Sequence, residues 1–478
     1  MLGLALGMVA LDNARVVGEV EAVTSCDLLV TGAELVATVD ADRREINGGW
    51  VAIGDGLVAA VGGPGDAPPE ASEVLRAEGC LVTPGLINTH HHIYQNLTRA
   101  YRPAVNGSLF EWLTTLYPQW ARLDEEAAYV SAWIGLAELA LGGCTTTTDH
   151  LYVHPRHGGD LITAEITAAR ELGLRFHPTR GSMSLSEKDG GLPPDSVVQD
   201  DEEILADSER LVAQHHDPAW GAMVRVALAP CSPFSVTSGL MRATAELAER
   251  LDVRLHTHLA EDPDEDTFAD KAFGMRTIDH FEAVGWMTDR SWVAHCIYPN
   301  AGEIARLGAA GVGVAHCPSS NMMIGGGGMA PVHELRAAGA PVGLGCDGSA
   351  STDCASMWLE ARGALLLGRM RKGPQSMGAR DALEIATRGS AGCLGREGEL
   401  GVLATGAAGD LVCWPLEGIP FAGALSDPVE AWLRCGPVAA RHTVVAGQVV
   451  VRDGRLAAPG EEDMLRRHRA ISARIQAM

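Results

Sequence analysis

Long apolar runs and positive charge are both scarce in this sequence. No apolar run approaches the ~20 residues that a membrane-spanning helix needs. Of the 478 residues, 37 are Lys or Arg against 61 Asp or Glu, which gives a formal net charge of −24. A chain of this charge repels a phosphate backbone or an anionic lipid surface, so nucleic-acid binding and membrane binding are excluded as main functions. The expected partner is a small molecule or another copy of the chain.

Paired cysteines are also absent, because the 11 Cys residues are odd in number, scattered and never spaced as C-x-x-C. This usage is typical of reduced thiols in a cytoplasmic protein and excludes a disulfide framework or a cysteine-rich zinc site. Residues 2–11 are apolar but lack the basic segment that precedes the core of a signal peptide. We therefore expect residues 1–26 to form a weakly ordered leader.

Both ends of the chain carry the pattern of β-hairpins. Near the start, Asp55-Gly56 separates two short apolar runs, which is a strong signal for a tight turn between two strands. A similar pattern of apolar runs covers residues 409–414 and 443–454. We expect one small β-sandwich assembled from both chain ends, residues 27–82 and 396–456.

The middle of the chain alternates between strand-like and helix-like segments. The segments between the strands carry helical spacing and are long enough for the crossovers that parallel strands require. Eight such units over residues 83–395 predict an α/β fold with a closed (β/α)8 TIM barrel, followed by an exposed amphipathic helix at 457–478. The candidate strands are residues 80–88, 144–149, 174–179, 223–229, 253–258, 292–295, 313–316 and 342–346.

Histidines and an aspartate stand where these strands end, which is where the working residues of such a barrel lie. Because side chains alternate across a strand, His90 and His92 share a face and His91 points away. His258 ends the fifth strand and Asp347 follows the eighth. Three imidazoles and one carboxylate suit one divalent ion, zinc before iron, and such an ion lowers the pKa of a coordinated water toward ~7.

Two further polar residues stand beside this set. Glu261 follows His258 by three positions and could be an ordinary surface carboxylate, but beside an activated water it could move a proton to a ring nitrogen, which hydrolytic deamination requires. His295 ends the sixth strand and can hydrogen-bond the attacking water or the developing anion. His91 and His256 are expected to be structural.

These residues lie in motifs that resemble the amidohydrolase superfamily, in its single-metal branch of cytosine, guanine and adenosine-type deaminases and triazine hydrolases. The resemblance extends over nearly the whole chain and is carried by residues 84–92 (PGLINTHHH), 258–261 (HLAE), 293–295 (VAH) and 345–348 (GCDG). The fourth strand offers no lysine of the kind that the two-metal branch uses, so one metal is expected.

The resemblance implies a role for each of these polar residues at the strand ends. It makes Glu261 the proton shuttle, His295 a helper of the activated water, and Asp347 both a base and a ligand. The complete set of metal ligands that it implies is His90, His92, His258 and Asp347.

Four more segments are similar to the 8-oxoguanine deaminases, and the triazine hydrolases share much of the same frame: residues 94–100, 109–118, 180–184 and 229–235. Gln95 resembles the glutamine with which guanine-type deaminases hold the base, and an amide can both donate to and accept from a purine lactam edge. Trp112 and Tyr117 either stack on a flat substrate or form helix core. Arg180 and Cys231 receive no role.

The function expected from the residues and the resemblance together is hydrolytic deamination of an aminated heterocycle, first of all 8-oxoguanine to urate and ammonia. The alternative is a triazine or isocytosine-type hydrolase with the same machinery and another leaving group. A catalytically inactive scaffold is disfavoured, because such proteins usually lose metal ligands and every ligand position is intact here. Analogy with the family also predicts a homo-oligomer.

Overall fold

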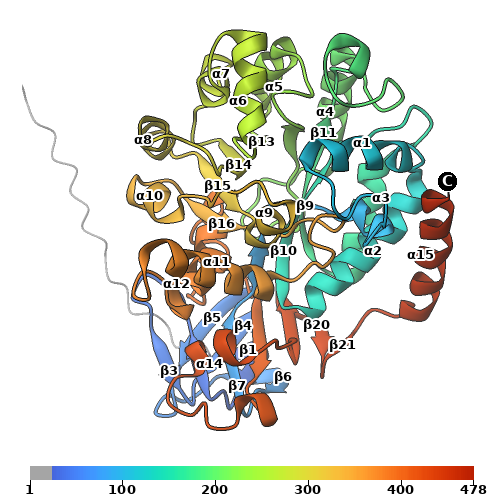
Figure 1. Cartoon of the computed structure of the whole chain (residues 1–478). Coiled ribbons are helices and arrows are strands. Elements are labelled where there is room, and N and C mark those ends of the chain that lie inside the picture. Colours follow the sequence, from blue (N-terminus) through green and yellow to red (C-terminus); the bar gives the residue numbers. More distant parts are fainter. Residues whose placement is uncertain (1–23, 478) are drawn as a thin grey trace, which may run out of the picture.

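A closed barrel of eight parallel strands, ringed by helices, forms the centre of the molecule (Figure 1). The structure is a computed structural model and describes residues 24–477. The predicted α/β barrel is confirmed, and its eight strands follow chain order around the barrel. They are β8 (Leu86–Asn88), β10 (Cys144–Leu151), β11 (Arg175–Ser182), β12 (Ala227–Pro230), β13 (Leu255–Leu259), β14 (Ser291–His295), β15 (Gly313–His316) and β16 (Val342–Leu344).

Helices connect the barrel strands and cover their outer faces. Local signals set several of their ends; for example, the Thr237 side chain accepts a hydrogen bond from Leu240 N at the start of α5, and Asp252 ends that helix with a positive φ. Their bounds are α1 (Leu109–Trp120), α2 (Glu125–Leu141), α3 (Leu161–Leu172), α4 (Asp201–His215), α5 (Ser238–Leu251), α6 (Pro263–Phe273), α7 (Thr277–Ala283), α8 (Ala301–Ala309), α9 (Pro318–Ile324), α10 (Val332–Ala337), α11 (Met357–Lys372), α12 (Ala379–Glu384), α13 (Ser390–Cys393), α14 (Pro428–Cys435) and α15 (Glu461–Gln476), with short turns η1 (Ile93–Thr98), η2 (Glu187–Asp189), η3 (Ile385–Gly389) and η4 (Ile419–Phe421).

Two outer sheets are built from the chain ends, one from the N-terminal part alone and the other from both ends, and side chains of both sheets share one apolar cluster. One sheet has the order β5 (Leu57–Gly62), β4 (Trp50–Gly54), β1 (Ser25–Thr31), β6 (Glu70–Arg76). The other has the order β21 (Arg455–Leu456), β20 (Gln448–Arg452), β19 (His442–Val445), β18 (Leu411–Pro415), β7 (Cys80–Pro84), β2 (Leu35–Ala37), β3 (Glu45–Asn47). As predicted, Asp55 and Gly56 join β4 to β5, and both have positive φ.

Three expectations need adjustment at the chain ends. Strand β1 begins at Ser25, inside the stretch expected to be a leader, while residues 1–23 lie outside the described residues. The expected strand 80–88 is two strands, because β7 belongs to the outer sheet and β8 to the barrel. Helix α15 is not simply exposed, since it packs on α2 and η1 and buries Ile471 and Ile475.

Gly85 is the reason that the expected strand divides. A Cβ at this position would lie 2.0 Å from Thr145 Oγ1 and 2.6 Å from Thr145 Cβ, so no side chain fits. The chain therefore passes from the outer sheet into the barrel at a point of close backbone approach. Beyond β8, the short strand β9 (His91–His92) pairs with β17 (Asp347–Gly348), which brings the first and eighth strand ends together at the barrel mouth.

We predict that Gly85→Ala lowers the free energy of unfolding by about 1–3 kcal/mol, because the new methyl overlaps the Thr145 side chain. Denaturant titration followed by tryptophan fluorescence measures the change. Gly65→Ala is the matched control, since Gly65 is exposed and a Cβ there meets no atom within 4 Å. Equal stability of the two variants would show that the barrel entry tolerates a side chain.

Candidate active site

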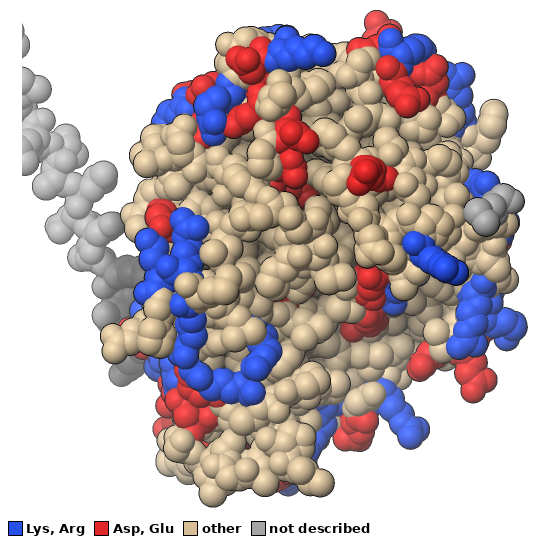
Figure 2. Space-filling model, in the orientation of Figure 1, with Lys and Arg blue, Asp and Glu red and all other residues tan. Residues whose placement is uncertain are grey.

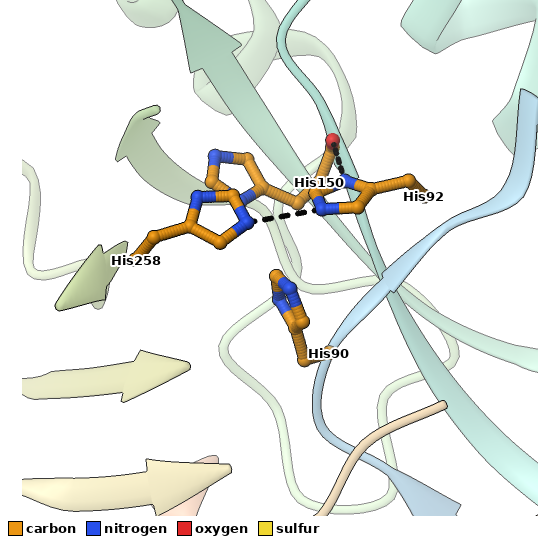
Figure 3. Close-up of side chains that lie close together, drawn as sticks. All are labelled: His90, His92, His150 and His258. Carbon is orange, nitrogen blue, oxygen red and sulfur yellow. Dashed lines mark hydrogen bonds between the residues drawn. The ribbon is translucent and has the colours of Figure 1, made fainter. Parts of the chain in front are cut away.

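The side chains of His90, His92, His258 and Asp347 meet at the C-terminal mouth of the barrel, and Figure 3 shows the three histidines. Asp347 Oδ1 lies 3.2 Å from His90 Nε2 and 3.3 Å from His92 Nε2, and the Nε2 atoms of His92 and His258 are 3.0 Å apart. Ligand atoms about 2.0–2.1 Å from a tetrahedral zinc ion lie roughly 3.3 Å from one another, so these separations suit such an ion. The structure thus brings the four predicted ligands together.

The imidazoles of His92 and His258 are each fixed by a hydrogen bond from Nδ1, the ring nitrogen that does not face the cluster. His92 Nδ1 donates to His150 O at 2.7 Å, and His258 Nδ1 donates to Cys231 O at 2.6 Å. A carbonyl oxygen accepts only, so in the neutral form both Nε2 atoms carry lone pairs. Two lone pairs facing each other at 3.0 Å repel, and a cation between them removes that repulsion. The donor set therefore fits a divalent metal.

His90 is oriented by a short relay through a second histidine. His256 Nδ1 donates to Trp292 O at 2.9 Å, which leaves His256 Nε2 as the acceptor for His90 Nδ1 at 2.8 Å. The His90 proton is thereby fixed on Nδ1, and Nε2 faces Asp347. The His256 ring also stacks on the Trp292 indole, with centroids 4.4 Å apart. His256 thus orients His90, a predicted ligand, through this hydrogen bond.

Burial sets the protonation of the histidines in this site. It lowers the pKa of His90 and of His258 well below the ordinary value, because the interior disfavours the charged ring. Neutral imidazole is the form that binds a metal ion. His90 and His258 are therefore already deprotonated at neutral pH.

Asp347 is held in its ionised form by its neighbours. Burial alone would raise the pKa of this carboxyl group, but hydrogen bonding to His90 and His92 holds it well below the usual range. The hydroxyls of Ser320 and Ser351 donate to Oδ2, and His91 Nδ1 donates to the Asp347 carbonyl at 2.5 Å. His91, expected to be structural, thus fixes the backbone that carries Asp347.

Glu261 and His295 lie on the outer side of the cluster. His295 Nε2 is 3.5 Å from Glu261 Oε1 and 4.0 Å from Asp347 Oδ2, while its Nδ1 donates to Asn321 Oδ1 at 2.9 Å. Burial and the charge of Asp347 raise the pKa of Glu261 well above its ordinary value. Glu261 is therefore a neutral acid at the barrel mouth, beside His295.

The loop that carries Glu261 is fixed by a second carboxyl group. The two oxygens of Glu265 accept hydrogen bonds from the backbone N–H groups of Ala260 and Glu261, each at 2.8 Å. Ala260 has a positive φ of 52°, a strained conformation that these two bonds stabilise. The position of the acid is thus set by backbone contacts and not by its own side chain.

His150, at the end of β10, belongs to the cluster although the sequence did not single it out. One ring nitrogen from each of His90, His92, His150 and His258 lies within 4.8 Å of the others (Figure 3). His150 Nε2 donates to Ala229 O at 2.9 Å, and its ring stacks on His258. Its position at a predicted strand end was the signal that could have identified it.

Gln95 lies in η1, fully buried beside the cluster. Its side chain packs on Gly348, where a Cβ would lie only 1.8 Å from Gln95 Oε1. Neither Oε1 nor Nε2 has a hydrogen-bond partner among residues 24–477. A buried amide with both groups unpaired is costly, so Gln95 is a candidate to pair with a bound molecule.

The other candidate residues have clear packing contacts. Trp112 and Tyr117 lie on the buried side of α1 in an apolar cluster that also contains Cys231, and Trp112 Nε1 donates to Ala350 O at 3.1 Å. These contacts support the helix-core alternative, and stacking on substrate stays a prediction. Arg180 is buried and pairs with Asp207 at 2.6 Å, so its contacts are structural.

Comparison with known proteins agrees with this geometry. A family model described as "Amidohydrolase family" matches residues 81–450. The chain belongs to the amidohydrolase family. As an amidohydrolase, it is a hydrolytic enzyme with a buried, histidine-rich site that can hold a metal.

Individual relatives of this amidohydrolase cover most of its length. It is 50% identical over 440 residues to an 8-oxoguanine deaminase of Pseudomonas aeruginosa, which covers 92% of this chain and 97% of that one. It is 37% identical to a hydroxydechloroatrazine ethylaminohydrolase of Pseudomonas sp. (strain ADP), over 91% and 92% of the two chains. The structure of an atrazine chlorohydrolase from Arthrobacter aurescens TC1 complexed with zinc superposes with a TM-score of 0.88 at 34% identity, covering 93% of this chain and 100% of that one.

We predict that His256→Phe weakens zinc binding about 10–100-fold, because the phenyl ring keeps the stack on Trp292 but cannot accept the His90 proton. Competition with a chromophoric chelator measures the affinity. His256→Gln is the matched control, since its amide oxygen can replace Nε2 as the acceptor. If both variants bind zinc like the unmodified chain, the relay does not orient His90.

Proposed function

We propose that this amidohydrolase converts 8-oxoguanine to urate and ammonia by hydrolytic deamination. The similarity to the P. aeruginosa 8-oxoguanine deaminase over 97% of that chain carries the proposal. The geometry supports it, because an ionised carboxylate and a neutral carboxylic acid both lie near His295, and an unpaired amide packs against Gly348, the residue after that carboxylate. A purine with an exocyclic amine needs all three.

We propose further that His90, His92, His258 and Asp347 hold one divalent metal ion, zinc before iron. Their mutual distances, and the Nδ1 hydrogen bonds that turn each Nε2 toward the others, support this assignment. When bound, such an ion acts as a Lewis acid that makes water nucleophilic at neutral pH.

The two carboxyl groups divide the proton transfers. Asp347, ionised, takes a proton from the attacking water and later gives it to the departing amine, which leaves as ammonia. Glu261, neutral, protonates the ring nitrogen next to the reacting carbon and regains a proton from the new hydroxyl as the carbonyl forms. His295 lies between the two carboxyl groups and is placed to hydrogen-bond the attacking oxygen. Each proton then has a carrier.

Gln95 supplies recognition in this proposal. Its amide offers one acceptor and two donor hydrogens, which complement the lactam edge of a purine. The enclosed position of the amide strengthens the selection, because a substrate without that edge leaves buried polar groups unpaired.

The alternative is a triazine or isocytosine-type hydrolase using the same site. Two observations favour keeping it: the 37% identity to the hydroxydechloroatrazine ethylaminohydrolase and the superposition on the atrazine chlorohydrolase. An ammonia-release screen of the zinc-loaded enzyme over 8-oxoguanine, guanine, isocytosine, cytosine and hydroxylated triazines separates the two. Fastest turnover of 8-oxoguanine supports the proposal, and turnover of a triazine alone contradicts it.

We also propose a cytoplasmic homo-oligomer. All 11 cysteines are free in the structure, which supports a reducing compartment. Apolar side chains on α9 and α11 are exposed, which supports association between copies: Met322, Met323, Leu366 and Met370.

Within residues 24–477, every helix is too short or too polar to span a bilayer. Positive and negative side chains are mixed on the face drawn in Figure 2.

The C-terminal helix supports the segment that carries Gln95. His468 Nε2 donates to Asn96 Oδ1 at 2.8 Å, and Gln476 Nε2 donates to Leu97 O at 2.7 Å. Both contacts join α15 to η1, more than 370 positions earlier in the chain. The orientation of the recognition amide therefore depends on the end of the chain.

We predict that Glu261→Gln keeps the metal and loses most of the turnover, whereas His258→Ala loses both. The amide of the first variant cannot move a proton, and the second variant removes a ligand nitrogen. Elemental analysis of the purified protein and coupled ammonia assays measure the two effects. His157→Ala, at an exposed histidine, is the control. Near-normal turnover by Glu261→Gln would exclude the proton-shuttle role.

We predict that His468→Ala raises KM for 8-oxoguanine about three- to tenfold while kcat and metal content change little, because one partly buried hydrogen bond that orients η1 is lost. Steady-state kinetics give the two constants separately. Arg469→Ala, on the exposed side of the same helix, should leave both unchanged. A fall in kcat with an unchanged KM would place the contribution of α15 elsewhere.

A further inference from the structure

The base of the barrel, at the opposite end from the active site, contains a cluster of four arginines. Arg175 is the first residue of β11, while Arg225 and Arg254 come shortly before β12 and β13. Arg396 lies in the segment after α13 that closes this end of the barrel. Catalytic residues of a TIM barrel lie at the opposite face, so residues at this face are expected to contribute to stability.

Two carboxylates offset part of this charge. Asp410 binds Arg175 through both oxygens, at 3.0 and 3.1 Å. Glu399 is shared by Arg225, at 3.2 Å, and Arg396. The side chains of Arg175, Arg396, Asp410 and Glu399 are at most 4% exposed. Among these six side chains, four guanidinium groups face two carboxylates, which leaves a surplus of two positive charges; Asp289 is a further acidic neighbour of Arg254, and Arg225 is 16% exposed.

Arg254 carries one of these surplus charges. It donates to Cys393 O at 2.8 Å and lies over the Trp292 ring at 5.9 Å, but it forms no ion pair within 4 Å with any carboxylate described in residues 24–477. Burial lowers the pKa of Arg254 to about 10, which reflects how poorly the charge is solvated.

Several donors in the cluster have no acceptor within the described chain. They are the Nε atoms of Arg225, Arg254 and Arg396, and Nη1 of Arg396. His177, in β11, also has neither ring nitrogen bonded, and its ring packs edge-on against the same Trp292 indole that Arg254 covers. Buried donors without partners in a native protein indicate an ion or a water molecule.

We propose that the base of the barrel binds a small inorganic anion of halide size between Arg396, Arg254 and His177. Water would satisfy the donors but leave the surplus charge uncompensated, whereas an anion does both. The ligand is small because the cluster is tightly packed: Arg175 and Arg396 donate to one oxygen, Ala222 O, and a Cβ at Gly395 would lie 2.5 Å from Arg254 Nη1.

The anion has a structural role in this arrangement. Residues 391–409 cover the barrel base through an apolar cluster, and Arg396 and Glu399 lie in that segment. Repulsion between guanidinium groups works against this closure, and an anion among them screens it. The inference is independent of the proposed substrate, because every residue involved lies at the other end of the barrel.

Thermal unfolding of the zinc-loaded full chain tests the proposal. Sodium chloride is compared with sodium gluconate at constant ionic strength, since gluconate is too large for the site. We expect Tm to rise by about 2–4 °C in chloride. Equal Tm values in the two salts would overturn the proposal.

Two arginine variants locate the effect. Arg254→Gln should abolish the chloride dependence. Arg362→Gln should keep it, because Arg362 likewise donates to a backbone carbonyl, Leu433 O, and lies over an indole, Trp358 at 5.8 Å, but belongs to no arginine cluster. Loss of the chloride effect in both variants, or in neither, contradicts the site.

Bromide-soaked crystals of the unmodified protein give a readout that needs no variant. An anomalous peak within hydrogen-bond reach of Arg396 Nε supports the site. Bromide peaks elsewhere only, with none at the barrel base, would refute it.

Discussion

The placement of protons on the histidines is the constraint on which the active site depends. Each ligand imidazole gives its Nδ1 hydrogen to a fixed acceptor, a carbonyl oxygen for His92 and His258 and the ring of His256 for His90. Three Nε2 lone pairs are thereby turned toward one buried point beside an ionised carboxylate. Such a set is unfavourable by itself, because the lone pairs repel, and becomes stable only around a cation.

Much of this site could be predicted from local rules. Alternation along a strand placed His90 and His92 on one face, and strand ends placed His258 and Asp347 at the same mouth, as the structure confirms geometrically. The supporting residues could not be predicted in this way. His256 and Glu265 act through partners that are distant in sequence or through backbone N–H groups, and no periodicity records such contacts.

The fold shows the same division between local and long-range signals. Hydrophobic patterning identified every barrel strand, but it could not show that residues 80–88 change sheets, because the break at Gly85 depends on the Thr145 side chain of another strand. Patterning also gave α15 as an amphipathic helix without its target. Its apolar side is covered by α2 and η1, and only the assembled barrel brings those elements to the chain terminus.

Opposite protonation of two neighbouring carboxyl groups is what turns this metal-binding geometry into a site for deamination. Hydrogen bonding to His90 and His92 keeps Asp347 ionised, and its negative charge, together with burial, keeps Glu261 protonated. Burial contributes most to the raised pKa of Glu261, and the charge of Asp347 adds to it. In the proposed reaction, the ionised Asp347 acts as the base. The presence of a neutral acid beside it fits a reaction in which a ring nitrogen must be protonated before an amine can depart.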